Sequence, residues 1–304
     1  MIPLAEPYLS GNEWKYLKEC LDTNWVSSAG PFVDRFERAV ADYVGTPYAV
    51  ACVNGTAALH AALLAAGVTS GDEVLVPALT FAAPAFAARY AGAWPTFVDV
   101  DPASCQMDPE GVRAFLKEEC ELQGGTTINR ATGRPVRAII PVHILGHPVD
   151  MDPLIALAKE YHLVVIEDAA ESLGARYKGK SIGALGEIAC FSFNGNKIIT
   201  TGGGGMIVTR RKDWADKIRY LTTQAKDDPI EYVHNEIGYN YRLTNIQAAL
   251  GVAQMELLDS YLERKRQIAD RYKEGLQGIL GIKLPEASPW AESTWWLYTI
   301  RVDS

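Results

Sequence analysis

Short apolar segments that alternate with helical patterns constrain the fold of this chain more than any other feature. The pattern predicts strands at residues 48–53, 73–77, 94–100, 136–142 and 163–167, and helices at residues 12–22, 31–44, 107–120 and 151–161. Strands that alternate with helices at this short spacing form a largely parallel sheet with helices on both faces. We therefore predict an α/β fold whose ligand site lies at the carboxyl ends of the strands.

Composition and charge argue against several classes of protein. The chain has 304 residues, a net charge of -8 and no basic tract, which argues against nucleic acid or an anionic membrane surface as a partner. No apolar run reaches membrane-spanning length, and the first residues lack a secretory signal. The five cysteines are scattered without a C-x-x-C pair, so we expect no zinc site and no disulfide framework, and a reducing cytoplasm.

One segment, residues 191–206, combines a lysine with four consecutive glycines and reads FSFNGNKIITTGGGGM. The Lys197 amine can attack a carbonyl if it is desolvated, and the glycines let a backbone lie close to a ligand. The segment is not a P-loop, because the lysine precedes the glycines. Most lysines are solvated surface charges, so this segment alone leaves a surface role open.

A second candidate feature is the turn that follows the strand expected at residues 48–53. Asn54, Gly55 and Thr56 connect that strand to a helix rich in alanine and leucine. The free N–H groups of a helix's first turn, together with its dipole, bind anions. An ordinary connection capped by Asn54 or Thr56 is the alternative, and this stretch alone favours it.

Further candidates lie where other predicted strands end. Phe81 follows the strand at 73–77 and is either a core residue or a plate that stacks on a flat ligand; Asp168 directly follows the strand at 163–167. His143 and His147 lie in a loop interrupted by proline and glycine. We expect a structural or substrate-lining role for these histidines rather than a metal pair.

These features together match the needs of one cofactor. Pyridoxal phosphate requires a lysine that forms a Schiff base, a carboxylate that keeps its ring nitrogen protonated, donors for its phosphate and contacts on both faces of its ring. Lys197, Asp168, the turn at residues 54–56 and Phe81 supply such groups in one ordered set. Each is weak alone, and the combination predicts a pyridoxal phosphate site.

The motifs resemble those of the DegT/DnrJ/EryC1/StrS family of sugar aminotransferases, and the resemblance covers essentially the whole chain. It rests on VNGTAALHAAL, VPALTFAAPAFA, PVHILGHPVDMDPL, VIEDAAESLGA, FSFNGNKIITTGGGGMI and EIGYNYRLTNIQAALG. It implies an aspartate-aminotransferase-like fold (PLP fold type I). A large, mixed but mostly parallel sheet domain would span residues 1–245, and a bridging helix with the start of a smaller α+β domain residues 246–304. The motifs are most similar to the subgroup that makes 4-amino sugars for legionaminic acid or bacillosamine-type glycans.

Carried over by position, the resemblance also implies roles for single residues. Lys197 would bind the cofactor covalently and shuttle the proton, Asp168 would pair with the ring nitrogen, and Phe81 would stack on the ring. The phosphate would be held by the backbone of Gly55, Thr56 and Ala57, by the Ser192 hydroxyl, and by Asn240 from the partner subunit of a homodimer.

Two parts of the chain need separate comment. Many relatives carry Gln or His beside the ring oxygen where this chain has Glu171, and a carboxylate there would be repelled by a phenolate. We therefore expect Glu171 either to be protonated or to point elsewhere. Residues 245–276 are expected as one long helix and residues 295–302 as a strand; because one strand cannot complete a domain, we expect further residues to follow.

The function implied by the resemblance is transfer of an amino group from L-glutamate to the 4-keto carbon of a nucleotide-linked sugar. The expected acceptor is a UDP-linked 4-keto-6-deoxy-N-acetylhexosamine, in surface-glycan or nonulosonic acid biosynthesis. A sugar dehydratase that uses the same cofactor is an alternative, although related dehydratases replace the lysine by histidine. A non-catalytic regulatory protein on the same fold is an alternative from another class.

Overall fold

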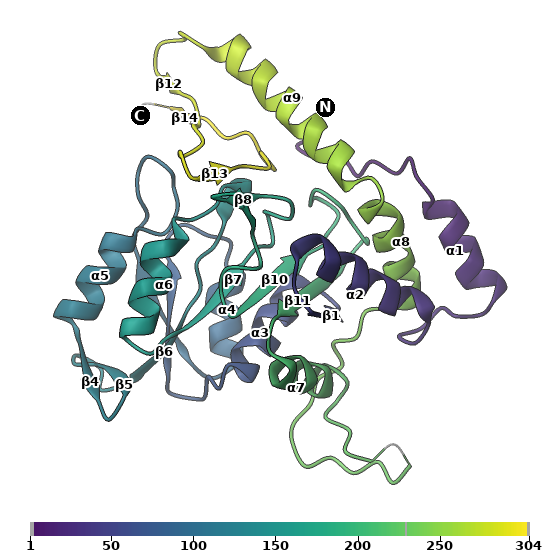
Figure 1. Cartoon of the computed structure of the whole chain (residues 1–304), viewed down its shortest axis with the longest axis horizontal. Helices are drawn as coiled ribbons and strands as arrows, with labels where there is room; N and C mark the ends of the chain where they lie inside the picture. Colours follow the sequence, from purple (N-terminus) through teal and green to yellow (C-terminus); the bar gives the residue numbers. More distant parts are fainter. Residues whose placement is uncertain (1–2, 229, 303–304) are drawn as a thin grey trace.

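A nine-stranded sheet organises the computed structural model, which describes residues 3–228 and 230–302 (Figure 1). Its strands follow the order β1-β11-β10-β7-β6-β2-β3, with β5 beside β6 and β4 beside β5. The bounds are β1 (Tyr48–Cys52), β2 (Glu73–Pro77), β3 (Trp94–Val98), β4 (Cys120–Gln123), β5 (Thr126–Asn129), β6 (Pro135–Ile139), β7 (Val164–Asp168), β10 (Ile188–Ser192) and β11 (Gly205–Thr209).

The strand directions bring several chain segments to one edge of the sheet. The strands β10, β7, β6, β2 and β3 are parallel to one another. Because β11 is antiparallel to both β1 and β10, β1 runs in the same direction as they do. The residues that follow Cys52, Pro77, Asp168 and Ser192 therefore meet at the carboxyl edge. The predicted α/β fold with a mostly parallel sheet is confirmed.

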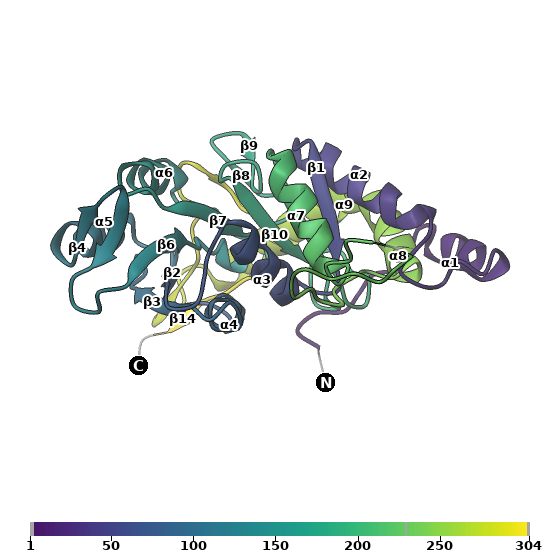
Figure 2. The ribbon, with the colours of Figure 1, turned by 90° about the horizontal axis from the view of Figure 1, so that it is seen from below.

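Helices cover both faces of the sheet, and successive side chains of a strand pack into two different hydrophobic clusters. Along β2, Leu75 belongs to the cluster that includes residues of α2, α5, α6 and α8, whereas Val74 and Val76 belong to the cluster that includes residues of α3, α4 and α7. Figure 2 shows α6 above and α4 below one half of the sheet. The bounds are α1 (Glu13–Asp22), α2 (Pro31–Val44), α3 (Gly55–Ala65), α4 (Ala83–Tyr90), α5 (Pro109–Glu118), α6 (Met151–Glu160), α7 (Lys212–Thr222), α8 (Asn245–Met255) and α9 (Leu258–Leu276).

The single long helix expected over residues 245–276 is wrong, because the structure has two helices there, α8 and α9. The chain leaves helical geometry at Leu257, with φ -112° and ψ 0°. The small side chains of α8, such as Ala249, are buried in the cluster shared with α2, whereas most of α9 is exposed. The two helices therefore have different surroundings: α8 packs into the core, whereas α9 lies largely in solvent. One straight helix would not fit both.

The strand expected at residues 295–302 is wrong for most of its length. Only β14 (Arg301–Val302) pairs there, with β12 (Ile282–Lys283). Trp295 has φ +52°, far from the β region, and the preceding chain forms β13 (Ala291–Glu292) beside β8 (Arg176–Tyr177), which pairs with β9 (Lys180–Ser181). Contacts with the rest of the protein, rather than apolar alternation, determine this path.

The first helix presents a different face from the one its apolar residues suggest. Trp14 and Leu21 are 78% and 59% exposed, whereas Tyr16 and Cys20 are buried. The Tyr16 hydroxyl donates to Glu256 at 2.6 Å, so α1 packs on α8 by that face. Strands β4 and β5 form an antiparallel hairpin beside β6. Within the described residues, every helix is too short or too polar to span a bilayer.

Candidate active site

Asp168 is the last residue of β7, and its carboxyl group is buried with few partners. The side chain is 5% exposed, and Oδ1 accepts a hydrogen bond from the Ala170 N–H at 3.1 Å. Oδ2 receives no hydrogen bond from the described residues. Burial raises the pKa of Asp168 to about 6. A buried carboxylate with an open acceptor is suited to a cationic N–H donor from a ligand.

The preceding residue, Glu167, is buried in a saturated network. Its Oε2 accepts from Gly183 N–H at 3.0 Å and from His143 Nε2 at 3.1 Å, and its Oε1 accepts from Leu185 and Gly186 N–H groups at 2.9 and 2.7 Å. Burial acts to raise the pKa of Glu167, but the bonds from His143 and the backbone outweigh it and hold that pKa below its usual value. Glu167 therefore has no accepting capacity left for a ligand.

The tautomer of His143 follows from its two partners. The Val149 N–H donates to His143 Nδ1 at 3.1 Å, so Nε2 carries the proton and donates to Glu167. The His143 N–H also donates to the Asp168 carbonyl at 3.1 Å. His143 thus joins its loop to the end of β7, which is a structural role, one of the two expected for it. The loop itself contains a short 3₁₀ turn, Ile144–Gly146.

Lys197 lies in the loop after β10, with its amine turned into the protein. The side chain is 14% exposed, and Nζ lies 3.6 Å from Glu171 Oε1. Burial lowers the pKa of Lys197, while the carboxyl groups of Glu171 and Asp168 oppose that shift. A lower pKa increases the fraction of neutral, nucleophilic amine at a given pH. The structure therefore brings Lys197 and Asp168 to the same edge, as the sequence predicts.

Glu171 is directed at Lys197 and is anchored on its other side. Its Oε2 accepts from the Leu145 N–H at 2.7 Å, while Oε1 faces the lysine amine. The sequence offered two interpretations, a protonated side chain or one pointing elsewhere. The ion pair with Lys197 is a third arrangement, which depends on a long-range contact with Leu145.

The amino end of α3 forms a cradle against the end of β10. A Cβ atom at Gly55 would lie 2.9 Å from Ser192 Cβ, so glycine permits this close approach. Asn54 Oδ1 caps the helix by accepting from the Ala57 N–H at 2.8 Å, which occupies one of the three predicted phosphate donors. The N–H groups of Gly55 and Thr56 and the Ser192 hydroxyl donate to no acceptor within the described residues. Capping and an anion cradle therefore coexist here.

Phe81 and Asn240 are exposed. Phe81 follows β2 at the carboxyl edge and is 75% exposed, so its ring is free to stack on a ligand. Asn240 lies between α7 and α8, where it forms an isolated β-bridge with Thr223; parts of this connection project beyond α7 (Figure 1). The next residue, Tyr241, lies against its own chain, where its carbonyl accepts from the Val53 N–H at 2.8 Å. The Asn240 side chain makes no hydrogen bond to the described residues.

Sequence reasoning missed Trp296, whose indole adjoins Lys197. The ring centroid is 4.1 Å from Lys197 Nζ, and Nε1 donates to the Asn196 carbonyl at 2.7 Å. The signal was a pair of tryptophans inside a stretch whose alternation resembles a strand. Nothing in that alternation indicates which of the two tryptophans contacts Lys197.

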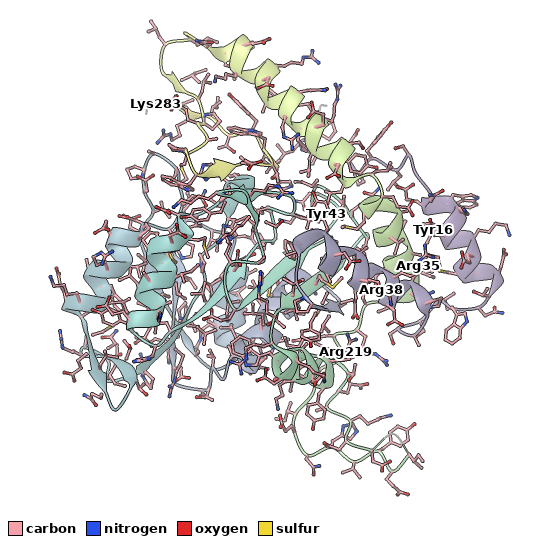
Figure 3. All side chains as sticks on the ribbon, viewed as in Figure 1. Tyr16, Arg35, Arg38, Tyr43, Arg219 and Lys283 are labelled. Carbon is pink, nitrogen blue, oxygen red and sulfur yellow. The ribbon has the colours of Figure 1, made fainter. Side chains whose placement is uncertain are left out.

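Basic side chains on α2 line a groove away from this edge. Figure 3 shows Arg35, Arg38 and Tyr43 along α2 beside α8, where they border a groove of about 640 Å³. Acidic side chains share its walls, so positive charge does not accumulate there and we assign it no ligand; these are Asp42 and Glu256.

The residues at the carboxyl edge fit pyridoxal phosphate. Asp168 has an open acceptor for a protonated ring nitrogen, and Lys197 has a desolvated amine. The cradle between Gly55 and Ser192 offers free donors for a phosphate, and Phe81 offers an open aromatic face. Each matches one part of the cofactor.

Comparison with known proteins agrees with this geometry. The model of the DegT/DnrJ/EryC1/StrS aminotransferase family matches residues 7–304. The chain is 44% identical to GDP-perosamine synthase of Caulobacter vibrioides, over 99% of this chain and 77% of that protein. It is 40% identical to EpsN of Bacillus subtilis, provisionally named a pyridoxal phosphate-dependent aminotransferase, over 100% of this chain and 76% of that protein. A crystal structure of a DegT DnrJ EryC1 StrS aminotransferase from Brucella abortus superposes with a TM-score of 0.87 at 32% identity, over 96% of this chain and 75% of that one.

Proposed function

The chain belongs to the DegT/DnrJ/EryC1/StrS aminotransferase family, and we propose that it transfers the amino group of L-glutamate to the 4-keto carbon of a nucleotide-linked 4-keto-6-deoxy sugar. It is a pyridoxal phosphate-dependent nucleotide-sugar aminotransferase of the fold type I α/β class. The observation that carries the proposal is the meeting of Asp168 and Lys197 at one edge, beside a cradle for phosphate.

The residues at this edge divide the chemistry among them. Bound pyridoxal phosphate supplies the electron sink that transamination requires. The Lys197 amine holds the cofactor and moves a proton on and off the reacting carbon, and Asp168 keeps the proton on the ring nitrogen. Gly55, Thr56 and Ser192 hold the phosphate, and Phe81 covers the ring.

The nucleotide carrier is proposed from the relatives, because spacing in the sequence does not indicate one. The Caulobacter vibrioides relative is named for a GDP-linked sugar, and its similarity extends over 99% of this chain. The motifs also resemble a subgroup that uses UDP-linked N-acetylhexosamines. We place a GDP-linked sugar first and a UDP-linked N-acetylhexosamine second. Either acceptor would serve surface polysaccharide synthesis in the cytoplasm.

We propose that the active unit is a homodimer. The catalytic edge is open in one chain, since Phe81 is 75% exposed, and the segment before Asn240 carries Ile230 and Ile237, each 81% exposed. A second copy that covers both would bury these apolar side chains and shield the catalytic edge from bulk solvent. In this arrangement Asn240 completes the phosphate site of the partner. We also propose that residues 1–245 form the large domain and residues 246–304 begin the smaller one.

An absorbance experiment tests the proposed reaction. The purified protein should show the spectrum of lysine-bound pyridoxal phosphate, and L-glutamate should convert it to the aminated form. A GDP-linked 4-keto-6-deoxy sugar should then reverse the change, faster than its UDP-linked N-acetylated counterpart. Reversal by 2-oxo acids other than 2-oxoglutarate, with none by either sugar, would contradict the proposed acceptor. Loss of a sugar hydroxyl without amination would favour the dehydratase.

A further inference from the structure

Part of the chain near its carboxyl end, residues 293–296, crosses the carboxyl edge of the sheet as an irregular segment that we call the strap. The Thr294 N–H donates to the Gly146 carbonyl at 3.0 Å. Lys265 Nζ of α9 donates to the Trp296 carbonyl at 2.9 Å. These bonds attach the strap to the loop after β6 on one side and to α9 on the other.

Trp296 closes one side of the Lys197 amine. Its side chain is 6% exposed, and its ring centroid lies 4.1 Å from Lys197 Nζ. Its Nε1 donates to the carbonyl of Asn196, the residue before the lysine, at 2.7 Å. One side chain therefore contacts both the reacting amine and the backbone that carries it. An aromatic face attracts an ammonium group, more strongly when both are desolvated.

We propose that Trp296 is a positioning residue for Lys197, whose indole holds the amine where it can attack the aldehyde of pyridoxal phosphate. The inference deepens the proposed function, because it rests on covalent attachment of the cofactor to Lys197. In that attachment the Lys197 nitrogen forms a C=N bond while the aldehyde C=O bond breaks, and the oxygen leaves as water with two protons from the amine.

The pKa of Lys197 should depend on which side chain replaces the Trp296 indole beside its amine. Glu171 lies 3.6 Å away and Asp168 contributes at longer range, and both raise the pKa of Lys197 against the lowering effect of burial. The charge of Lys265 lies at the strap carbonyl. Replacing Trp296 by another aromatic residue keeps a π face on the amine, whereas an aliphatic residue removes it.

The experiment compares Trp296→Phe and Trp296→Leu, with Trp295→Phe as the matched control. Trp295 is also in the strap, but its ring packs toward Tyr298, with centroids 6.0 Å apart. Each protein is freed of cofactor and mixed with pyridoxal phosphate at a series of pH values. The rate of attachment is read from absorbance, and borohydride trapping with peptide mass analysis confirms that Lys197 carries the label.

At high pH, where the amine is neutral, we expect the plateau rate of Trp296→Leu to fall roughly ten- to a hundred-fold through misplacement of the amine. Trp296→Phe should fall less, because the ring face remains and only the bond to Asn196 is lost. The pH midpoint should lie about 0.5–1.5 units lower in Trp296→Leu than in Trp296→Phe, since only the phenyl face stabilises the ammonium. Trp295→Phe should match the unmodified protein in both quantities.

A Trp296→Leu protein that unfolds at the normal temperature and keeps the plateau rate and midpoint of Trp295→Phe would overturn the proposal. If Trp296→Leu does not fold, Trp296→Phe decides: a reduced plateau supports the positioning role, and an unchanged plateau overturns it. Neither glutamate nor a sugar is present, so these outcomes do not depend on the proposed donor and acceptor.

Discussion

Glu167 and Asp168 are neighbours at the end of β7, yet their carboxyl groups meet opposite surroundings. Glu167 accepts four hydrogen bonds from His143 and residues 183–186, and they hold its pKa low against burial. Asp168 accepts one bond, from Ala170, and burial raises its pKa to about 6. A buried carboxylate whose acceptors are filled stabilises the fold, whereas one with an open acceptor is available to a ligand.

The largest expected effect comes from removing the Lys197 amine, which lies at the same edge of the sheet as Asp168. Lys197→Ala should reduce turnover by at least about 10⁴-fold, because both covalent attachment and proton transfer need that nitrogen. Cofactor should still bind through its phosphate, and borohydride should no longer label the chain. Steady-state rates and peptide mapping check this. Labelling of a different lysine with retained turnover would place the reaction elsewhere.

The amide variant Asp168→Asn separates catalysis from binding. An amide cannot keep a pyridinium protonated, so we expect kcat to fall roughly 10²- to 10³-fold, with most of the bound cofactor retained by the phosphate donors. The measurement is kcat at saturating cofactor, with cofactor content determined after dialysis. A rate near that of the unmodified protein would remove Asp168 from the mechanism.

The corresponding variant of the carboxylate that stabilises the fold is Glu167→Gln. It should lower the free energy of unfolding by roughly 3 kcal/mol, because an amide NH₂ group then faces backbone N–H donors in a buried network. Urea unfolding measures the loss, and the cofactor spectrum of the folded fraction should stay unchanged. A Glu167→Gln protein with normal stability but an altered cofactor spectrum would contradict this assignment, because Glu167 would then act on the cofactor rather than on stability.

A smaller effect is expected from Asn240→Ala, which tests whether a partner subunit completes the phosphate cradle between Gly55 and Ser192. One charge-assisted hydrogen bond to phosphate contributes roughly 1.5–3 kcal/mol, so Asn240→Ala should weaken cofactor binding about ten- to a hundred-fold without unfolding the protein. Mixing Lys197→Ala with Asn240→Ala should restore part of the activity if sites are shared, because a mixed dimer then holds one intact site. No recovery would place Asn240 within its own subunit's site or in a structural role.

The sequence predicts the sheet and its edge well where local pattern and burial agree. Strand β2 and helix α2 lie where their apolar periodicity places them. Asp168 follows a predicted strand, and Lys197 lies within the segment marked by glycines. The sequence could not predict the partners of Glu171 and Trp296, because these side chains make long-range hydrogen bonds, Glu171 with Leu145 and Trp296 with Asn196. The same contacts override the alternation near Trp296 that resembles a strand.

The difference between the two carboxylates is tested most directly by unfolding the cofactor-free protein as a function of pH. The folded-state pKa of Asp168 is raised, so its contribution to stability is present at low pH and is lost as pH rises from about 4 to about 6. The folded-state pKa of Glu167 is lowered, so its contribution is present at neutral pH and is lost in acid. Above pH 6 we therefore expect Asp168→Asn to be more stable than the unmodified protein, by up to roughly 3 kcal/mol, and Glu167→Gln to be less stable. Asp168→Asn less stable than the unmodified protein at that pH would contradict an open, unsatisfied carboxylate at the end of β7.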